Sequence, residues 1–287
     1  MSAGQPGGPP GEVDLHMHST ASDGSLAPSA VVDAARAAGL AAIALTDHDT
    51  LAGLQEAELA AAPFGIRVVR GVELSAHDGA REIHLLALHV SKPDKLEEQL
   101  VNFRDQREVR AQNIVERLRR LGIDVALETV MQEAGGGAVG RPHVARALIK
   151  GGHVRDSREA FDRFLGAGKP GFSPKTRLEV AEAISITHAA GALAIWAHPG
   201  QEGRRERVEA YAKLGLDGIE VKHPSHYPED VKRLSALADF FGLLPSGGSD
   251  WHGSSEGPRT IGCMHIPPSW LHQQDVLVAR RAAAGVA

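Results

Sequence analysis

The stretch Asp14-Leu15-His16-Met17-His18, near the start of the chain, joins a short apolar run to a pair of histidines. Two later stretches repeat the pattern, Thr46-Asp47-His48-Asp49 and Gly248-Ser249-Asp250-Trp251-His252. Each follows an apolar run, and the three are far apart in the sequence. Imidazole and carboxylate groups suit divalent metal ions, so the pattern predicts a metal centre built from distant segments.

Composition limits the classes of protein that the chain can belong to. Its 287 residues, 43% of them hydrophobic, are enough for one large α/β barrel. A net charge of −5 argues against a protein that coats long DNA or RNA, but it allows one nucleotide end to bind in a local basic pocket. Cys263 is the only cysteine, which excludes an internal disulfide and a Cys-based zinc site. A single thiol fits a reducing compartment, so we expect a cytoplasmic protein.

The sequence predicts no association with a membrane. Its apolar runs are all shorter than the roughly 18 residues that a spanning helix needs. Residues 1–11 are rich in Gly and Pro and lack the basic and apolar regions of a signal peptide. We expect them to form a disordered leader.

Short apolar runs alternate with amphipathic stretches over most of the chain. Strands are expected at 13–17, 40–45, 66–72, 83–90, 193–197, 218–221 and 243–244, with helices such as 28–38 and 50–62 between them. Runs that are apolar at consecutive positions are typical of strands buried on both faces of a parallel sheet. About seven strand–helix alternations predict an α/β fold that resembles a barrel.

The middle of the chain follows a different pattern. Apolar residues spaced by about 3.6 predict a long amphipathic helix, with Leu96, Leu100, Phe103, Ile114, Leu118 and Leu121 on its apolar face. Shorter helices are expected at 125–134, 142–150 and 157–165. We interpret residues 92–173 as a helical insertion that caps one end of a barrel formed by residues 12–91 and 174–287.

Residues that can bind metals cluster where the predicted strands end. In an α/β barrel these ends meet at one face, which would bring together six histidines, two aspartates and one glutamate. They are His16, His18, Asp23, His48, Glu73, His84, His198, Asp250 and His252. Any one of them has a simpler explanation: Asp23 suits a turn, and an aspartate of the Thr46-Asp47-His48-Asp49 stretch suits a helix N-cap. Their shared position at strand ends favours a common metal centre.

Together these motifs resemble those of the PHP (polymerase and histidinol phosphatase) superfamily over residues 12–266. The resemblance implies a distorted (β/α)7 barrel with a trinuclear metal site at its mouth. One metal would be held by His16, His18, Glu73 and Asp250, and a second by Glu73, His84 and His198. The third would be held by Asp23, His48 and His252. Some family members have histidine in place of Asp23, which leaves the metal preference of the third site open.

The donor set has a chemical interpretation of its own. Imidazole and carboxylate ligands without thiolate suit Mn, Fe or Zn, and we expect two or three ions, with Mn first among them. A bridging Glu73 could hold two metals roughly 3.5–4 Å apart. Such a pair activates water and neutralises phosphoryl oxygens, so a metal-bound hydroxide is the expected nucleophile and no protein nucleophile is needed.

Substrate-binding residues are expected in and near the insertion. The branch of the family that the chain resembles, nucleoside 3′,5′-bisphosphate phosphatases and a 5′→3′ exoribonuclease, shares the segments around Gly140-Arg141-Pro142-His143 and Gly168-Lys169-Pro170. We predict a bidentate clamp by Arg141 on a phosphate, with His143 and Lys169 beside it. His223 and His226 are candidates for substrate contact or for protonation of the leaving oxygen. The alternative is that these side chains are solvated surface groups.

The expected activity is hydrolysis of the 3′-phosphate of nucleoside 3′,5′-bisphosphates to give 5′-monophosphates. Three alternatives stay open. They are a 5′→3′ exoribonuclease acting on short 5′-phosphorylated RNA, a histidinol phosphatase, and a metal-binding module without catalysis. The expected partner is a small nucleotide or a short RNA end, and neither a membrane nor long DNA. The sequence does not determine the oligomeric state.

Overall fold

A computed structural model describes residues 11–79, 81–174, 178–254 and 259–285. The predicted leader, residues 1–11, lies outside these ranges except for Gly11. No helix within the described ranges combines the length and the apolar character needed to cross a bilayer.

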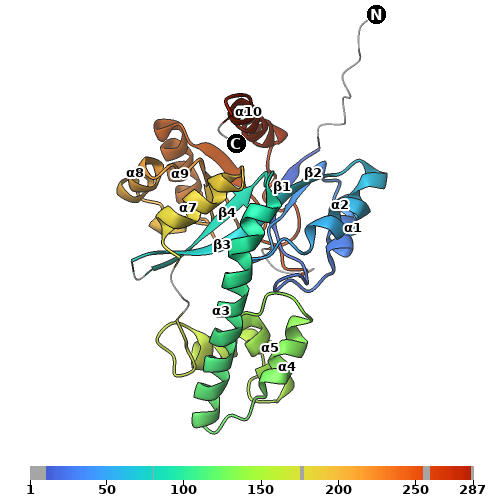
Figure 1. The fold of residues 1–287 in the computed structure, drawn as a ribbon, viewed down its shortest axis with the longest axis vertical. Helices are drawn as coiled ribbons and strands as arrows, with labels where there is room; N and C mark the ends of the chain where they lie inside the picture. Colours follow the sequence, from blue (N-terminus) through green and yellow to red (C-terminus); the bar gives the residue numbers. More distant parts are fainter. Residues whose placement is uncertain (1–10, 80, 175–177, 255–258, 286–287) are drawn as a thin grey trace, which may run out of the picture.

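Seven strands form a sheet whose order follows the sequence. They are β1 (Val13–Met17), β2 (Ala42–Leu45), β3 (Arg67–Asp78), β4 (Arg81–Leu88), β5 (Leu193–Trp196), β6 (Gly218–Lys222) and β7 (Leu244–Gly247). The segments that follow β7 and β1 join, where the amide of His18 donates to the carbonyl of Trp251 at 2.9 Å. The sheet therefore nearly closes, which confirms the predicted seven-stranded barrel (Figure 1).

Ten α-helices are found in the described residues. They are α1 (Pro28–Ala37), α2 (Leu54–Ala61), α3 (Pro93–Arg120), α4 (Leu127–Ala134), α5 (Arg141–Lys150), α6 (Ser157–Ala160), α7 (Val180–Ala189), α8 (Arg205–Lys213), α9 (Pro228–Phe241) and α10 (Pro268–Ala283). Several begin with proline in the first turn, where its missing amide costs nothing. A π-helical turn, η2 (Phe161–Leu165), extends α6.

The prediction of a parallel sheet was wrong for one strand. β4 runs antiparallel to both β3 and β5, whereas the other neighbouring pairs are parallel. β3 and β4 form a long hairpin, paired from Gly71 opposite Leu88 to Asp78 opposite Arg81. Glu73 therefore lies inside a twelve-residue strand and does not end it as predicted. Apolar runs buried on both faces carry no signal of strand direction, which explains the error.

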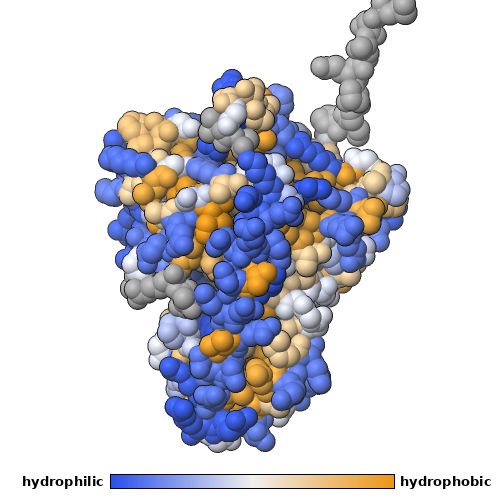
Figure 2. Space-filling view, viewed as in Figure 1, coloured by the Kyte–Doolittle hydropathy of each residue, from blue (hydrophilic) through white to orange (hydrophobic). Residues whose placement is uncertain are grey.

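The insertion has a hydrophobic core of its own, and α3 connects it to the barrel (Figure 1). Leu96 and Leu100, near the start of α3, pack into the barrel core. Ile114 and Leu118, near its end, pack against α4 and α5 in the second core. Leu121 was predicted on the same apolar face, but it is 49% exposed because the helix ends at Arg120. Figure 2 shows polar side chains over most of this face of the molecule, with hydrophobic residues in small separate patches.

Candidate metal centre

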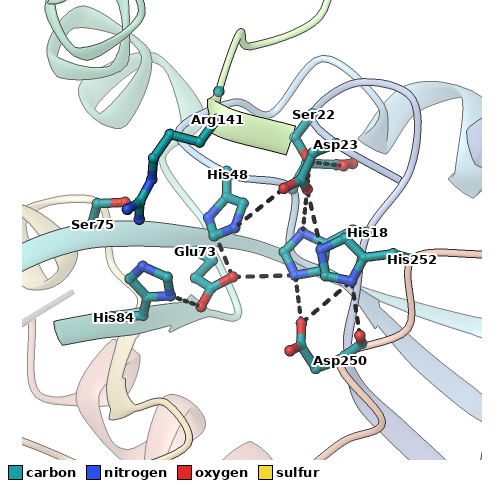
Figure 3. Close-up of polar contacts among 12 residues, drawn as sticks. His18, Ser22, Asp23, His48, Glu73, Ser75, His84, Arg141, Asp250 and His252 are labelled. Atoms are coloured by element: carbon teal, nitrogen blue, oxygen red, sulfur yellow. Dashed lines mark hydrogen bonds and ion pairs between the residues drawn. The ribbon is translucent and has the colours of Figure 1, made fainter. Parts of the chain in front are cut away.

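Glu73 lies at the centre of the site. Its Oε2 atom is 3.2 Å from Nε2 of His16, 3.2 Å from Nε2 of His18 and 3.3 Å from Nδ1 of His48. Its Oε1 atom is 2.7 Å from Nδ1 of His84 and 3.0 Å from Nε2 of His198. One buried carboxylate thus contacts five imidazoles from four segments of the chain, and Figure 3 shows three of them, those of His18, His48 and His84. This arrangement suits a carboxylate that bridges metal ions.

The potential metal ligands form three groups, within each of which the donor atoms lie no more than 4.8 Å apart. The first contains His16, His18, Glu73 and Asp250, all of them buried. These are the four residues predicted for the first metal. Asp250 Oδ1 lies 3.2 Å from Nε2 of His18 and 3.5 Å from Nε2 of His16, so both carboxylates face the same two rings.

The second group contains His48, Glu73 and His84. His198 was predicted here with Glu73 and His84, and its Nε2 atom lies 3.2 Å from Nδ1 of His84. Two ring nitrogens this close, both facing Glu73, suit a shared cation. His48 therefore joins a group to which the sequence did not assign it.

The third group contains His18, Asp23, His48 and His252. Asp23 lies 3.2 Å from Nε2 of His252 and 3.9 Å from Nε2 of His48. His18 belongs to both the first and the third group, since its Nδ1 atom lies 3.8 Å from Asp23 while Nε2 faces Glu73 and Asp250. The structure thus places all nine predicted ligands around one rim, and Figure 3 shows seven of them, all except His16 and His198.

Two of these histidines have buried ring nitrogens that are not satisfied within the protein. Nδ1 and Nε2 of His18 and Nδ1 of His48 have no hydrogen-bond partner among the described residues. Burial lowers the pKa of His48 to about 3 despite the nearby Glu73, which leaves a neutral imidazole with a free lone pair. For His18 burial acts in the same direction, but Asp250 and Glu73 outweigh it and raise the pKa to about 10. Unsatisfied buried nitrogens beside carboxylates fit metal coordination.

The loop after β1 is fixed by a buried carboxylate that does not face the centre. Asp47 accepts hydrogen bonds from the amide of Ser19 at 2.7 Å and from the hydroxyls of Ser19 and Ser22 at 2.7 and 2.6 Å. Gly24 packs so closely that a Cβ there would lie 2.6 Å from the carbonyl oxygen of His18. These contacts hold Asp23 toward the metal rim.

Backbone strain also marks the site. Asp49, His198 and Asp250 have positive φ angles of 52°, 33° and 50°, a region that residues other than glycine rarely adopt. Such conformations cost free energy and occur mostly where function fixes a side chain. At His198 the cost is offset in part by a hydrogen bond of 2.6 Å from its amide to Oε2 of Glu220.

Sequence reasoning missed Glu220 and Arg259. Glu220 is fully buried in β6, and its Oε1 atom lies 3.2 Å from Nδ1 of His16. A carboxylate inside an apolar strand was the available signal, because a buried charge requires partners. Arg259 forms an ion pair with Asp250. It lies nine residues further along the chain in a loop without a recognisable motif.

The three predicted substrate-binding histidines are all hydrogen-bonded within the protein. Nδ1 of His143 accepts from the amide of Gly140 at 2.8 Å, so its Nε2–H donates to the carbonyl of Ser22 at 3.0 Å. Nε2 of His226 accepts from the amide of Gly200 at 3.1 Å, so its Nδ1–H donates to the carbonyl of Val221 at 2.9 Å. Nδ1 of His223 accepts from the amide of Ser225 at 3.1 Å, so Nε2–H points to Asp250, 3.4 Å away. These contacts place the rings in positions that support the loops of the site.

The two predicted basic residues differ in their surroundings. Arg141, at the start of α5, extends toward Ser75 beside the metal rim (Figure 3). Its guanidinium lies 3.7 Å from Glu82. Lys169 is exposed in the turn that follows η2.

Comparisons with known proteins agree with this geometry. A family model described as "PHP domain" matches residues 14–134. The chain is 36% identical to a 3′,5′-nucleoside bisphosphate phosphatase of Chromobacterium violaceum, covering 89% of this chain and 93% of the relative. It is 39% identical to a 5′-3′ exoribonuclease of Haemophilus influenzae, covering 83% and 89%. A solved structure described as a metal-dependent phosphoesterase of Bifidobacterium adolescentis superposes with a TM-score of 0.85 at 31% identity, covering 93% and 96%. The chain belongs to the PHP family of metal-dependent phosphoesterases.

Proposed function

We propose that this enzyme hydrolyses the 3′-phosphate of nucleoside 3′,5′-bisphosphates and releases the nucleoside 5′-monophosphate. The observation that carries the proposal is the contact of Glu73 with five imidazoles, together with the three overlapping groups of potential metal ligands around it. A relative that shares most of the chain is named for this activity. In the reaction, the oxygen of water bonds to phosphorus, the bond from phosphorus to the ribose 3′ oxygen breaks, and a proton passes to that oxygen.

The nine ligands fit two or three divalent ions, and we propose Mn²⁺ as the principal one. Bound ions of this kind lower the pKa of water and neutralise the charge on phosphoryl oxygens.

The chain's own residues position the reaction. Glu220 and His223 orient His16 and Asp250, and His143 holds the loop that carries Asp23. The insertion places Arg141 beside the rim, where its guanidinium can bind a phosphate oxygen. Lys169, exposed after η2, is a further cation of the insertion, and we propose that it contacts the substrate only from the periphery.

A substrate panel tests the proposal. The purified, Mn²⁺-loaded enzyme is incubated with adenosine 3′,5′-bisphosphate, adenosine 3′-monophosphate, adenosine 5′-monophosphate and histidinol phosphate. Release of orthophosphate and the nucleoside products are then quantified. We expect the bisphosphate to have the highest kcat/KM and to give the 5′-monophosphate. Equal rates on all four compounds, or a preference for histidinol phosphate, would contradict the proposal.

A second candidate function is 5′→3′ exoribonuclease activity. It is favoured by relatives in Haemophilus influenzae and Escherichia coli that carry this name, at 39% and 36% identity. The same water attack on a 3′ phosphodiester would release a 5′-mononucleotide. Short 5′-phosphorylated RNAs in the same panel separate the two. If they have the higher kcat/KM, and if activity falls steeply with salt as expected for contacts with several phosphates, exonuclease activity is the main function.

A further inference from the structure

Three consecutive backbone carbonyls of the loop after β1 accept hydrogen bonds from the insertion. The acceptors are, in this order, the carbonyls of Ala21, Ser22 and Asp23. Their donors are the amide of Ala138 at 3.0 Å, Nε2 of His143 at 3.0 Å and Nη1 of Arg146 at 3.4 Å. Because Asp23 belongs to the third group of ligands, these bonds join the insertion to a segment that carries a potential metal ligand.

The donors of the same loop point the other way, into the barrel. The amide and the hydroxyl of Ser19 and the hydroxyl of Ser22 donate to Asp47 at 2.7, 2.7 and 2.6 Å. The loop is thus held from two sides, since the barrel accepts from its donors and the insertion donates to its carbonyls. Figure 3 shows Ser22 and Asp23 beside the start of α5, the helix of the insertion that carries Arg141.

The contact between loop and insertion is buried and closely packed. His143 is 0% exposed and Ser22 is 1% exposed, so water does not replace either partner while the insertion is docked. A Cβ on Gly137 would lie 2.6 Å from the carbonyl oxygen of Thr20 and 2.7 Å from that of Ala21. Gly137 does not have a positive φ angle, so the close approach of the two backbones is what requires glycine here.

Asp23 connects this loop to the third group of ligands. Its carboxylate lies 3.2 Å from Nε2 of His252 and 3.9 Å from Nε2 of His48. Metal ligands tolerate displacements of only about 0.2 Å from the preferred distance, so the third group depends on the position of the loop. The ligands of the first group lie in strands or within three residues of a strand end. The sheet fixes those ligands, whereas the insertion helps to fix Asp23.

We propose that docking of the insertion on residues 21–23 is coupled to metal binding by the third group. The docked insertion holds Asp23 in the position that a metal ion requires, with His143 and Arg146 as positioning residues. Asp23, once it binds an ion, in turn keeps the loop against the insertion, because a coupling free energy acts equally in both directions. The enzyme therefore completes its metal centre only when the insertion is docked. This inference goes beyond the proposed function and does not depend on which phosphate ester is hydrolysed.

Metal content tests the first direction of the coupling. His143→Phe removes the donor to Ser22 and keeps an aromatic ring of similar size. We expect the affinity for the last equivalent of Mn²⁺ to fall about 10- to 100-fold, the range for loss of an outer-shell partner, while the ions around Glu73 bind as in wild type. Titration with Mn²⁺, with free Mn²⁺ measured by electron paramagnetic resonance, gives both affinities. His143→Gln, whose amide nitrogen can donate in place of Nε2, should restore most of the lost affinity.

Two further variants act on the same contact without changing a histidine. Gly137→Ala forces the backbones apart and should cause the same selective loss of the last equivalent. Arg146→Gln should have a smaller effect, since its bond to the loop is the longest of the three. Lys150→Gln is the matched control for Arg146→Gln. Both side chains contact Glu133 from α5, but Lys150 is 60% exposed, and its variant should bind Mn²⁺ as wild type does.

Hydrogen exchange tests the reverse direction. The amide of Ala138 exchanges when its bond to the carbonyl of Ala21 opens, so its rate reports docking directly. We expect saturating Mn²⁺ to slow the exchange of the peptide that contains Ala138 in wild type by about the factor seen in the affinities. Asp23→Asn, which keeps the ions around Glu73, should not show this slowing. Peptides of α10, at the opposite end of the barrel from the insertion, serve as the internal control (Figure 1).

Two results would overturn the coupling. One is a full Mn²⁺ complement of wild-type affinity in both His143→Phe and Gly137→Ala. The other is an equal slowing by Mn²⁺ of the Ala138 peptide in wild type and in Asp23→Asn. If His143→Phe does not fold, Gly137→Ala and the exchange measurement still decide. None of these outcomes bears on the proposed substrate, which the substrate panel tests with the wild-type enzyme.

Discussion

Glu220 fixes the orientation of His16, since its Oε1 atom lies 3.2 Å from Nδ1 on the side of the ring away from Glu73. The other oxygen of Glu220 accepts the amide of His198 at 2.6 Å. With a proton on Nδ1, the lone pair of His16 Nε2 faces the first group of ligands. Carboxylates in this position hold the tautomer of a metal-binding histidine and increase its basicity.

Glu220→Gln should therefore weaken metal binding. An amide has one oxygen and one NH₂ group, so it cannot accept from both His16 and the amide of His198. We expect the apparent affinity for Mn²⁺ to fall about 10- to 100-fold, as is typical when an outer-shell partner is lost. Activity measured against Mn²⁺ concentration, with metal content by mass spectrometry, gives the value. Glu209→Gln, which removes an exposed partner of Lys213, is the control, and equal Mn²⁺ affinity in the two variants would contradict the role of Glu220.

The close approach of the nine predicted ligands could be anticipated from the sequence because they lie next to short apolar runs, and the ends of such runs meet in an α/β barrel. Glu220 could not be assigned in this way, since its role depends on a partner 204 residues away. The direction of β4 was missed because a run of consecutive apolar residues has the same appearance in parallel and antiparallel strands buried on both faces. The contacts of His143 were missed for a further reason. Its acceptor is the backbone carbonyl of Ser22, and backbone partners leave no mark in the sequence.

The third group of ligands can be tested through Asp23. Asp23→Asn removes a charge that faces His48 and His252 at 3.9 and 3.2 Å, while Asp47 continues to hold the loop through Ser19 and Ser22. We expect the variant to lose about one equivalent of metal per chain, to keep the ions around Glu73, and to lose about 10- to 100-fold in kcat. Metal analysis after gel filtration measures the stoichiometry.

Asp33→Asn serves as the control for Asp23→Asn, since Asp33 forms an exposed pair with Arg36 far from the ligands. The assignment of a third metal to Asp23 would have to be abandoned if Asp23→Asn kept the wild-type metal content and kcat.

A buried ion pair joins the insertion to the barrel. Nε of Arg107, on α3, donates to Asp49 at 2.6 Å, and both side chains are at most 9% exposed. Arg107→Met removes the cation and leaves Asp49 buried without its charge partner. We expect the free energy of unfolding to fall by about 3–5 kcal/mol. Urea denaturation followed by circular dichroism measures it. The control is Arg36→Met, at an exposed pair, which should change the free energy of unfolding by less than about 1 kcal/mol. An equally small change for Arg107→Met would show that the Arg107–Asp49 pair does not stabilise the contact between insertion and barrel.

The stability of the protein should depend on pH through His143. Burial, with the nearby charge of Arg146, lowers its pKa to about 4, whereas an unfolded histidine titrates near 6.5. Between these values the unfolded state binds the proton and the folded state does not. The stabilisation is therefore complete above about pH 6.5 and is lost as the pH falls toward 4. Between pH 7.5 and pH 5, the free energy of unfolding of the wild type should fall by about 2 kcal/mol relative to that of His143→Gln. The contributions of the other histidines are the same in both proteins and cancel when their free energies of unfolding are subtracted. Urea titrations of both proteins measure this difference. If it were the same at pH 7.5 and at pH 5, a neutral His143 in the folded state would be excluded.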